Sequence, residues 1–390
     1  MRTALLVLVC LSLIFATASA QGIVVPGDAD GDMIVSDEEL RLAEQSYSEG
    51  KITSSELEEI RHIHDNYPIT IVDSANRTAT IYKPVERMII QPTSSYEPIW
   101  ILGAQDKVVG VTNTAKDLAY TWLPGIQDKS AIGGYKELDY EKIIELKPDI
   151  ALISKSGIET KGIDKILEPA GITVVGAEFV SLETFDSELK NIAQILEAEE
   201  QAEDFLAWRN EYLNSVKEKT NEIDPIVRVY GEWAHEERAT GGKTSAIDST
   251  IKAAGGANIA GDLDEYWIVL DPEFIMTENP EVIFFAAWED MLGITGYYLD
   301  SYDGAMQFVE LATNRTDLKD TYAMQNGRVY VLDAGCVLTS ARNFVPTLYL
   351  AKWFYPDLFE DLNPEAIHKE YFEKWLGIPY QGIWAYPQAS

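Results

Sequence analysis

A short pattern occurs twice in this chain, at residues 139–153 and again at residues 271–285. Each copy reads D-x-E-x-I, then four residues, then proline and an acid, then four apolar residues. Each copy predicts a short capped helix followed by a buried strand. The aspartate suits the N-cap, the proline stops the helix, and the apolar run fits a strand covered on both faces. A unit used twice at this distance predicts two α/β lobes that are built alike, with Glu141 and Glu273 at matching positions.

The first twenty residues are typical of a processing segment. Arg2 precedes an apolar run at 4–16, and Ala18-Ser19-Ala20 is similar to a signal-peptidase site. The run is too short for an ordinary membrane span, so residues 1–20 predict a signal peptide and a mature start at Gln21. We therefore expect a secreted, extracytoplasmic protein at the outer face of the cell membrane, although the sequence does not indicate an anchor.

The formal net charge of −33 argues against two classes of partner. A field of this sign opposes binding to nucleic acid and to anionic membranes. Cys10 lies in the predicted signal peptide and Cys336 is the only other cysteine, so no disulfide is expected within the mature chain. Asn76 and Asn314 begin glycosylation sequons whose occupancy stays open.

Residues 28–39 have the acid spacing of a twelve-residue EF-hand loop, which supplies the many oxygen ligands that Ca²⁺ requires. The predicted ligands are the carboxylates of Asp28, Asp30, Asp32 and Glu39 and the backbone carbonyl of Ile34. Met33 stands at position 6, where glycine is usual, so the tight turn is in question. A second loop at 45–56 lacks the first acids and is predicted to be empty. Residues 21–68 thus resemble a dockerin-like EF-hand module, the alternative being an acidic linker.

The rest of the chain alternates predicted strands with helical segments, which is typical of parallel sheets. The predicted strands lie at 88–90, 108–111, 150–153, 173–175, 227–230, 282–285 and 329–332. Residues 183–220 contain no proline or glycine and predict one long helix within a connecting segment at 182–222. The predicted fold class is therefore α/β, with an N-terminal lobe at 69–181 and a C-terminal lobe at 223–390.

Several weak motifs follow one another in a specific order. They are the strand and loop at 87–97, the glycines and tyrosine at 133–135, the segment 170–172, and the glycine-rich segments 240–244 and 254–259. In this order and spacing they resemble the ABC-transporter substrate-binding proteins of the cobalamin, haem and ferric-siderophore class, over about residues 69–390. The resemblance implies two Rossmann-like lobes joined by one long helix, with the ligand in the interlobe cleft. It also implies that Glu141 and Glu273 dock onto arginines of the membrane permease.

By position in that fold, the loops at strand ends face the cleft, including 155–156, 233–240 and 340–343. The predicted ligand contacts are Thr93, Ser94, Tyr96, Tyr135, Lys155, Trp233, Arg238, Trp267, Trp288 and Arg342. Aromatic walls suit large planar chelates, and arginines suit carboxylates on a porphyrin or siderophore. Whether a given aromatic is core or contact stays open, as does a role for His235 as an axial ligand.

The leading interpretation is a monomeric solute-binding protein that delivers a metal chelate to an ABC importer. Ferric siderophore, haem and corrinoid all stay open as the chelate. The sequence shows no nucleophile elbow, P-loop or dinucleotide fingerprint, so an enzyme is not expected. Four scattered histidines argue against a binder of free metal ions. The alternative is a calcium-dependent adhesion or scaffold protein that uses a solute-binding fold.

Overall fold

The computed structural model describes residues 22–116, 120–288, 292–335 and 340–387. The predicted signal peptide, the mature start at Gln21 and both cysteines lie outside the described residues. No helix within the described ranges is long and apolar enough to cross a membrane.

The N-terminal lobe is built on a five-stranded parallel sheet with the order β5-β4-β3-β8-β9. Its strands are β3 (Met88–Ile90), β4 (Val108–Val111), β5 (Ser130–Ala131), β8 (Ile150–Ile153) and β9 (Thr173–Gly176). Its helices are η1 (Thr93–Ser95), α3 (Tyr96–Ile101), η2 (Gln105–Lys107), η3 (Asn113–Lys116), η4 (Ile126–Asp128), α4 (Tyr140–Leu146), α5 (Lys155–Glu159), α6 (Asp164–Leu167) and η5 (Glu168–Ala170). The ribbons β1 (Ile69–Val72)–β2 (Thr78–Ile81) and β6 (Gly133–Gly134)–β7 (Glu137–Leu138) add to it.

The C-terminal lobe has a second five-stranded sheet, with the order β12-β10-β14-β15-β16. Its strands are β10 (Arg228–Trp233), β12 (Ala257–Asn258), β14 (Val282–Ala287), β15 (Val329–Asp333) and β16 (Ala385–Tyr386), of which only β16 is antiparallel to its neighbour. Its helices are α9 (Ala246–Ala253), α10 (Pro272–Glu278), α11 (Asp303–Thr313), α12 (Tyr322–Gln325), α14 (Val345–Phe354), α15 (Pro364–Glu370) and the π-helical η6 (Tyr371–Trp375). The ribbon β11 (Ala239–Thr240)–β13 (Ile268–Val269) completes it.

The repeated sequence pattern forms the predicted helix and strand in each lobe, as α4–β8 and α10–β14. Asp139 accepts a hydrogen bond from the Lys142 N–H at 2.9 Å, and Asp271 accepts one from the Glu273 N–H at 2.8 Å. Every residue of β8 and β14 is buried, as expected for strands covered on both faces. The predicted α/β architecture of both lobes is therefore confirmed.

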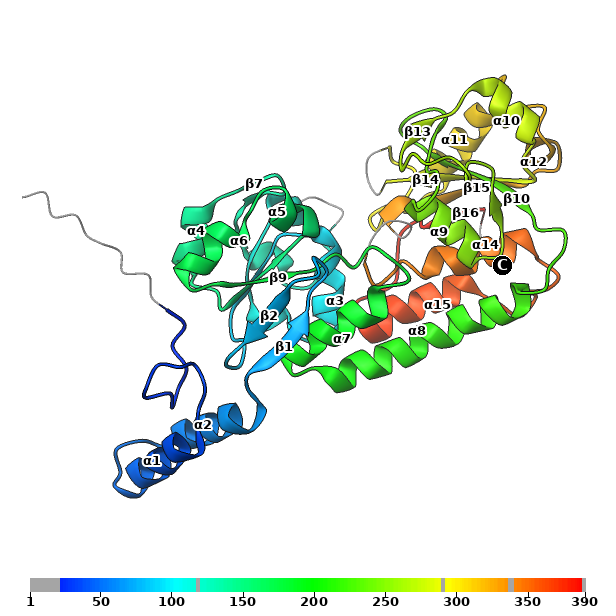
Figure 1. Ribbon diagram of the computed structural model, residues 1–390. Helices are drawn as coiled ribbons and strands as arrows, with labels where there is room; N and C mark the ends of the chain where they lie inside the picture. The colour runs from blue at the N-terminus through cyan, green and yellow to red at the C-terminus, as the bar shows by residue number, and fades with distance from the viewer. Residues whose placement is uncertain (1–21, 117–119, 289–291, 336–339, 388–390) are drawn as a thin grey trace, which may run out of the picture.

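The connecting segment is not one continuous helix, so that prediction is wrong. It forms α7 (Phe185–Leu196) and α8 (Glu199–Thr220), separated at Glu197, whose φ of 56° is left-handed (Figure 1). The Glu197 carboxylate accepts a hydrogen bond from the Tyr67 hydroxyl at 2.7 Å and lies 2.5 Å from His62 Nε2. Contacts with the N-terminal part of the chain thus hold the corner, and α8 alone extends beneath both lobes.

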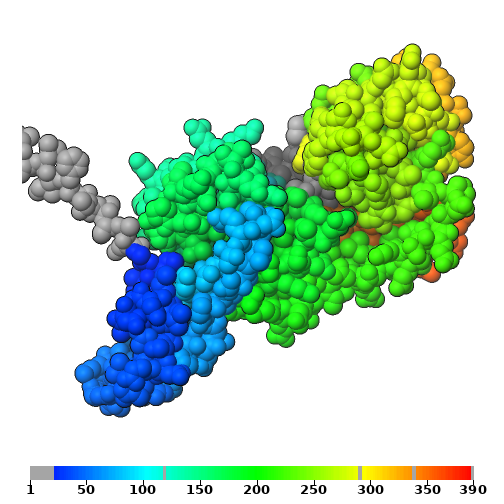
Figure 2. All heavy atoms as spheres, viewed as in Figure 1, coloured from blue at the N-terminus to red at the C-terminus, as the bar shows by residue number. Residues whose placement is uncertain are grey.

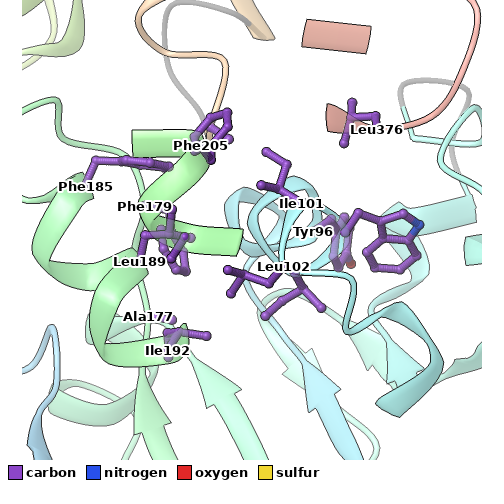
Figure 3. Packing of buried hydrophobic residues seen from close by; sticks show 14 of the residues in the cluster. Tyr96, Ile101, Leu102, Ala177, Phe179, Phe185, Leu189, Ile192, Phe205 and Leu376 are labelled. Carbon is purple, nitrogen blue, oxygen red and sulfur yellow. The ribbon is translucent and has the colours of Figure 1, made fainter. Parts of the chain in front are cut away.

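The connecting helices share a core with the N-terminal lobe. Phe185 on α7 and Phe205 on α8 lie on the side of this core opposite Ile101 and Leu102 of the α3 region (Figure 3). The rings of Phe185 and Phe205 meet edge to face with centroids 6.2 Å apart. Burial of this apolar surface, at about 25 cal/mol per Å² of area removed from water, fixes α7 and α8 against the N-terminal lobe.

The residues before the first lobe form α1 (Asp37–Ser48) and α2 (Ser54–Asn66), which project away from the two lobes (Figure 1). Each helix starts at a capping box, in which a Ser or Thr and the glutamate three residues later satisfy one another's backbone N–H groups. The loop between residues 28 and 36 precedes α1 directly. Two helices here are compatible with an EF-hand-like module, which stays a prediction.

Candidate functional site

A cavity of about 390 Å³ lies between the two lobes. The space-filling view is hollowed between the N-terminal lobe, in cyan and green, and the C-terminal lobe, in yellow (Figure 2). From the N-terminal lobe the cavity is lined by Glu178, Val180, Ser181 and Leu182, which follow β9. From the C-terminal lobe it is lined by Thr244, Ala246, Ser249, Thr250, Tyr266, Trp288 and Asn343. The segments that follow β9 and β14, both parallel strands, thus contribute to its walls, as is usual for ligand sites in α/β proteins.

Three indole rings are stacked in the C-terminal wall. Trp233, at the end of β10, is buried between Trp267 and Trp288. Its ring centroid is 5.4 Å from that of Trp267 and 6.0 Å from that of Trp288, with interplanar angles of 3° and 14°. Trp288 lines the cavity, whereas Trp267 is 40% exposed on the other side of Trp233. The stack therefore contributes one of its indoles, Trp288, to the cavity wall.

The N-terminal wall carries a carboxylate. Glu178 Oε1 accepts a hydrogen bond from the backbone N–H of Lys155 at 2.5 Å. Burial raises the pKa of Glu178, and the nearby charge of Glu188 raises it further. The side chain of Lys155 extends toward Glu159, with 3.8 Å between Nζ and the carboxylate. Lys155, a predicted ligand contact, thus holds a residue of the cavity wall through its backbone N–H but does not line the cavity itself.

A buried ion pair joins the lobes beside this cavity. Arg342 Nε donates to both carboxylate oxygens of Glu97 at 3.0 Å, and Tyr371 donates its hydroxyl proton to the same carboxylate. The Arg342 guanidinium also lies 5.1 Å from the ring centroid of Trp122 and 4.9 Å from that of Trp384. Arg342, predicted as a partner for a ligand carboxylate, is thus paired with the Glu97 carboxylate of α3 and does not line the cavity.

The predicted contacts on the loop after β3 are mostly internal. Tyr96 is fully buried and its hydroxyl forms a hydrogen bond with Thr112 at 2.7 Å. Ser94 is buried, and Thr93 is half-buried. Tyr135 is exposed, and its carbonyl accepts from the Gln91 amide at 2.9 Å. Tyr96 also packs edge to face against Tyr120, with ring centroids 5.4 Å apart. None of these four predicted contacts lines the cavity.

Arg238 and His235 lie behind the tryptophan stack. Arg238 has a left-handed φ of 64° and lies 3.7 Å from the Glu237 carboxylate. The His235 ring is exposed and packs 5.5 Å from the Trp267 ring. Neither residue lines the cavity.

Several residues of the cavity wall were missed by sequence reasoning. They are Glu178, Ser181, Thr250, Tyr266 and Asn343. The position of Glu178 just after a parallel strand was an available signal, because the carboxyl ends of such strands carry ligand sites. Asn343 lies in the loop 340–343 that the sequence placed near the cleft, but its residue type gave no indication of its surroundings.

The two glutamates at matching positions are both exposed. Glu141 lies in the first turn of α4 and Glu273 in the first turn of α10. Among the described residues, neither carboxylate forms a salt bridge. One turn further on, each helix exposes an apolar side chain, Ile144 and Met276, both at 44%. Each lobe thus presents an acid and an apolar residue on one short helix.

The acidic loop before α1 gathers three of its predicted ligands. Carboxylate oxygens of Asp28, Asp30 and Asp32 lie within 4.8 Å of one another. Met33 takes the left-handed conformation, with a φ of 70°, so the turn that usually requires glycine is made. Glu39 lies apart from this group, because its carboxylate accepts from backbone N–H groups, including that of Ala29 at 2.6 Å. These hydrogen bonds lower the pKa of Glu39 to about 2.

Comparison with known proteins gives consistent results. Residues 90–335 match the model of the periplasmic binding protein family. An uncharacterized ABC transporter substrate-binding lipoprotein of Bacillus subtilis, YvrC, is 26% identical over 303 residues, which cover 76% of this chain and 88% of the relative. A cobalamin-binding protein of Halobacterium salinarum is 24% identical, over 74% of this chain and 75% of the relative.

Among solved structures, the TroA-like periplasmic binding protein FepB from Veillonella parvula superposes with a TM-score of 0.72 at 22% identity, covering 82% of this chain and all of that chain. A periplasmic heme-binding protein from Pseudomonas aeruginosa gives a TM-score of 0.53 at 22% identity, covering 70% of this chain and 94% of that one. At these identities, the superpositions concern the fold alone.

Proposed function

The chain belongs to the periplasmic binding protein family, and on this premise we propose that it is an extracytoplasmic solute-binding protein that captures a metal chelate for an ABC importer. The observation that carries this proposal is the cavity between the lobes, with a wall of stacked indoles. Its relatives are substrate-binding transport proteins, which favours a role without catalysis. The substrate-binding lipoprotein among them supports a position outside the cytoplasm.

The cavity has the size and chemistry of a small-molecule site. Its volume of about 390 Å³ falls within the usual range of roughly 300–1,000 Å³ for ligand pockets. The indole face of Trp288 offers a rigid apolar surface to a large planar or bulky chelate at low entropic cost. Ferric siderophores, haem and corrinoids share such surfaces, and the name of one relative, a cobalamin-binding protein, supports this ligand class.

The ligand class is tested by what binds the purified full-length protein. We expect a chelate to copurify, or to bind when added, with a visible absorption band and a mass that identify it. Binding should quench tryptophan emission, because Trp288 lines the cavity and is stacked on Trp233. Absence of binding across representative siderophores, haem and corrinoids would overturn the proposal, and a calcium-dependent adhesion or scaffold role would then be the alternative.

We also propose that Glu141 and Glu273 dock onto cationic residues of the permease. Each is exposed at the start of a short helix, on a separate lobe (Figure 1). A single exposed ion pair contributes little, about 0–1 kcal/mol. Two acids held at a fixed separation act together, since the second contact forms at high effective concentration. The pair therefore favours one orientation of the protein on its transporter.

Charge reversal at both acids tests the docking proposal. The double variant Glu141→Lys with Glu273→Lys should lose permease-dependent uptake while its affinity for the chelate in solution changes less than about twofold. The matched control is Glu145→Lys with Glu278→Lys, which changes the net charge equally in the last turns of the same helices. Normal uptake by the first variant, or equal loss by the control, would contradict specific docking.

The acidic loop at 28–39 suits a calcium ion, and we propose that it binds one. Asp28, Asp30 and Asp32 are already close together, and hard cations of this size prefer such carboxylates. The carbonyl of Ile34 would complete this side of the site. Glu39 is predicted as a ligand from its position, but it would first have to release the backbone N–H groups that it accepts from.

Calorimetry with calcium on the full-length protein tests this site. Asp28→Asn with Asp32→Asn should abolish the calcium heat, and the affinity for the chelate should stay unchanged because the loop is remote from the cavity. Calcium heat that persists in this variant would show that the ion, if bound, is held elsewhere.

A further inference from the structure

Two arginines hold the C-terminal ends of α4 and α10, the short helices that carry the matching acids. Arg87 donates from Nε and Nη2 to the carbonyl of Leu146, the last residue of α4, at 3.1 and 2.7 Å. Arg228 donates from Nη1 to the carbonyl of Glu278, the last residue of α10, at 2.8 Å. The last carbonyls of a helix lack partners within it, and a cation is favourable at this end of the helix dipole. The same contact is therefore made once in each lobe.

The backbone of each arginine is fixed by the acid that follows the proline of the repeated pattern. Arg87 donates its N–H to Asp149 Oδ2 at 2.9 Å, and its carbonyl accepts from the Asp149 N–H at 2.8 Å. Arg228 donates its N–H to Glu281 Oε2 at 3.0 Å, and its carbonyl accepts from the Glu281 N–H at 2.8 Å. These reciprocal hydrogen bonds place each arginine beside the end of its helix in the same way.

Each arginine also belongs to the central sheet of its lobe. Arg87 directly precedes β3, which pairs with β8, and Arg228 begins β10, which pairs with β14. The arginine side chains thus join each short helix to the strand that lies beside the following strand. The hydrogen bonds to the terminal carbonyls span 59 and 50 positions, so this duplication arises from the fold and lies outside the repeated pattern itself.

The exposure of these arginines favours a role in orientation over a role in stability. The Arg228 side chain is 46% exposed and Arg87 is exposed as well, and such contacts contribute little to the free energy of unfolding. Each helix is seven residues long and is anchored at its middle by a buried isoleucine, Ile143 or Ile275. When the C-terminal contact is lost, the helix can pivot about this isoleucine, which moves the acid in its first turn.

We infer that Arg87 and Arg228 are positioning residues for docking, because they fix the directions of α4 and α10 and hence the separation of Glu141 and Glu273. This inference rests on the proposed docking function and extends it to residues that do not contact the permease. Two contacts act together only while their separation matches that of the partner sites. Holding both helices to their sheets maintains that separation.

The geometry is tested on the protein alone by pulsed electron paramagnetic resonance. Spin labels are attached at Glu145 and Thr277, exposed residues at equivalent positions of α4 and α10, in a background without native cysteines. The methionine variant, Arg87→Met with Arg228→Met, should broaden the distribution of distances between the labels. The lysine variant, with lysine at both positions, should keep it narrow, because an ammonium group can still donate to the terminal carbonyl.

The consequence for docking is measured as binding to phospholipid vesicles that contain the permease. The methionine variant should bind roughly 10-fold more weakly, and the lysine variant should recover most of the affinity. The control is Arg41→Met with Arg328→Met, which changes the net charge equally. Arg41 forms an exposed pair with Glu38, and Arg328 donates to the carbonyl of Phe354, the last residue of α14, at 2.9 Å. The control should bind the permease as the unmodified protein does.

Unchanged label distances or unchanged permease binding in the methionine variant would overturn the inference. An equal loss of binding in the control or in the lysine variant would overturn it too. Unfolding of the methionine variant that lysine does not prevent would show a general structural role, with the same consequence. Normal binding by Glu141→Lys with Glu273→Lys would instead overturn the docking proposal itself. A loss confined to that charge-reversal variant would leave docking standing and overturn only the role of the arginines.

Discussion

Replacing Arg342 by methionine should lower the free energy of unfolding by about 3–5 kcal/mol, because it leaves the carboxylate of Glu97 buried without its counterion. The side chains of Glu97 and Arg342 are 3% and 2% exposed, so water cannot replace the lost partner. Two contacts at 3.0 Å disappear, and among the described residues only the hydroxyl of Tyr371 remains on the carboxylate. Such a loss shifts the unfolding equilibrium at least a hundredfold.

Glu97→Gln should cost less, about 2–3 kcal/mol, because the amide oxygen still accepts from Arg342 although the charge is no longer balanced. The double variant, Glu97→Gln with Arg342→Met, should be more stable than the sum of the two single effects predicts, since neither charge is then left alone. The coupling energy of this cycle should reach about 1–3 kcal/mol.

Urea unfolding followed by circular dichroism measures each free energy. The matched control is Glu38→Gln, which removes the carboxylate from an exposed pair with Arg41 and should change stability by less than about 1 kcal/mol. The reasoning is refuted if Arg342→Met costs no more than this control, or if the effects at Glu97 and Arg342 are additive. Either result would mean that the pair does not join the lobes as a buried ion pair.

Three further predictions concern other groups. Burial, and then the charge of Arg342, hold the pKa of His368 well below its usual range. His368 therefore stays neutral in the folded protein, and the free energy of unfolding should fall as the pH drops below about 6.5, because the unfolded residue then gains a proton. In urea titrations at several pH values, His368→Gln should reduce this dependence of the unfolding free energy on pH. The pKa of Glu39 is lowered to about 2, so its ionised carboxylate stabilises the start of α1 fully above about pH 4.3, and this stabilisation is lost as the pH falls through 2. Glu39→Gln should therefore abolish this pH-dependent loss of protection in amide exchange of α1. Trp288→Ala should weaken chelate binding by roughly 10- to 100-fold and Trp267→Ala by less, because only Trp288 lines the cavity; equal losses in fluorescence titrations would contradict that placement.

Local sequence signals account for the helices and strands that the sequence predicts correctly. Asp139 and Asp271 cap their helices through hydrogen bonds to residues two or three positions away, and the prolines that follow end those helices. Apolar runs then form β8 and β14, which are buried throughout. Because each of these effects acts within a few residues, the α/β lobes and their central strands could be predicted from the chain alone.

The errors arise where distant segments meet. The corner at Glu197 has no glycine or proline to announce it and is held by Tyr67 and His62, more than a hundred positions earlier in the chain. Tyr96 had a plausible place in a ligand loop, but it is fully buried, with its hydroxyl bonded to Thr112 and its ring against Tyr120. Local propensity cannot anticipate such contacts, because their energy comes from surfaces brought together only in the folded state.

The sequence by itself determined the two lobes, the matching acids at 141 and 273 and the acid spacing of the loop at 28–39, since these depend on short-range hydrogen bonds and on residue periodicity. Only the tertiary structure decided which polar groups are available to a ligand. It paired Arg342 with Glu97, 245 positions away, and it oriented the Asn343 amide so that its oxygen accepts a hydrogen bond from Arg209. The physical reason is that a buried polar group is defined by its partner, and these partners come from parts of the chain that are distant in sequence.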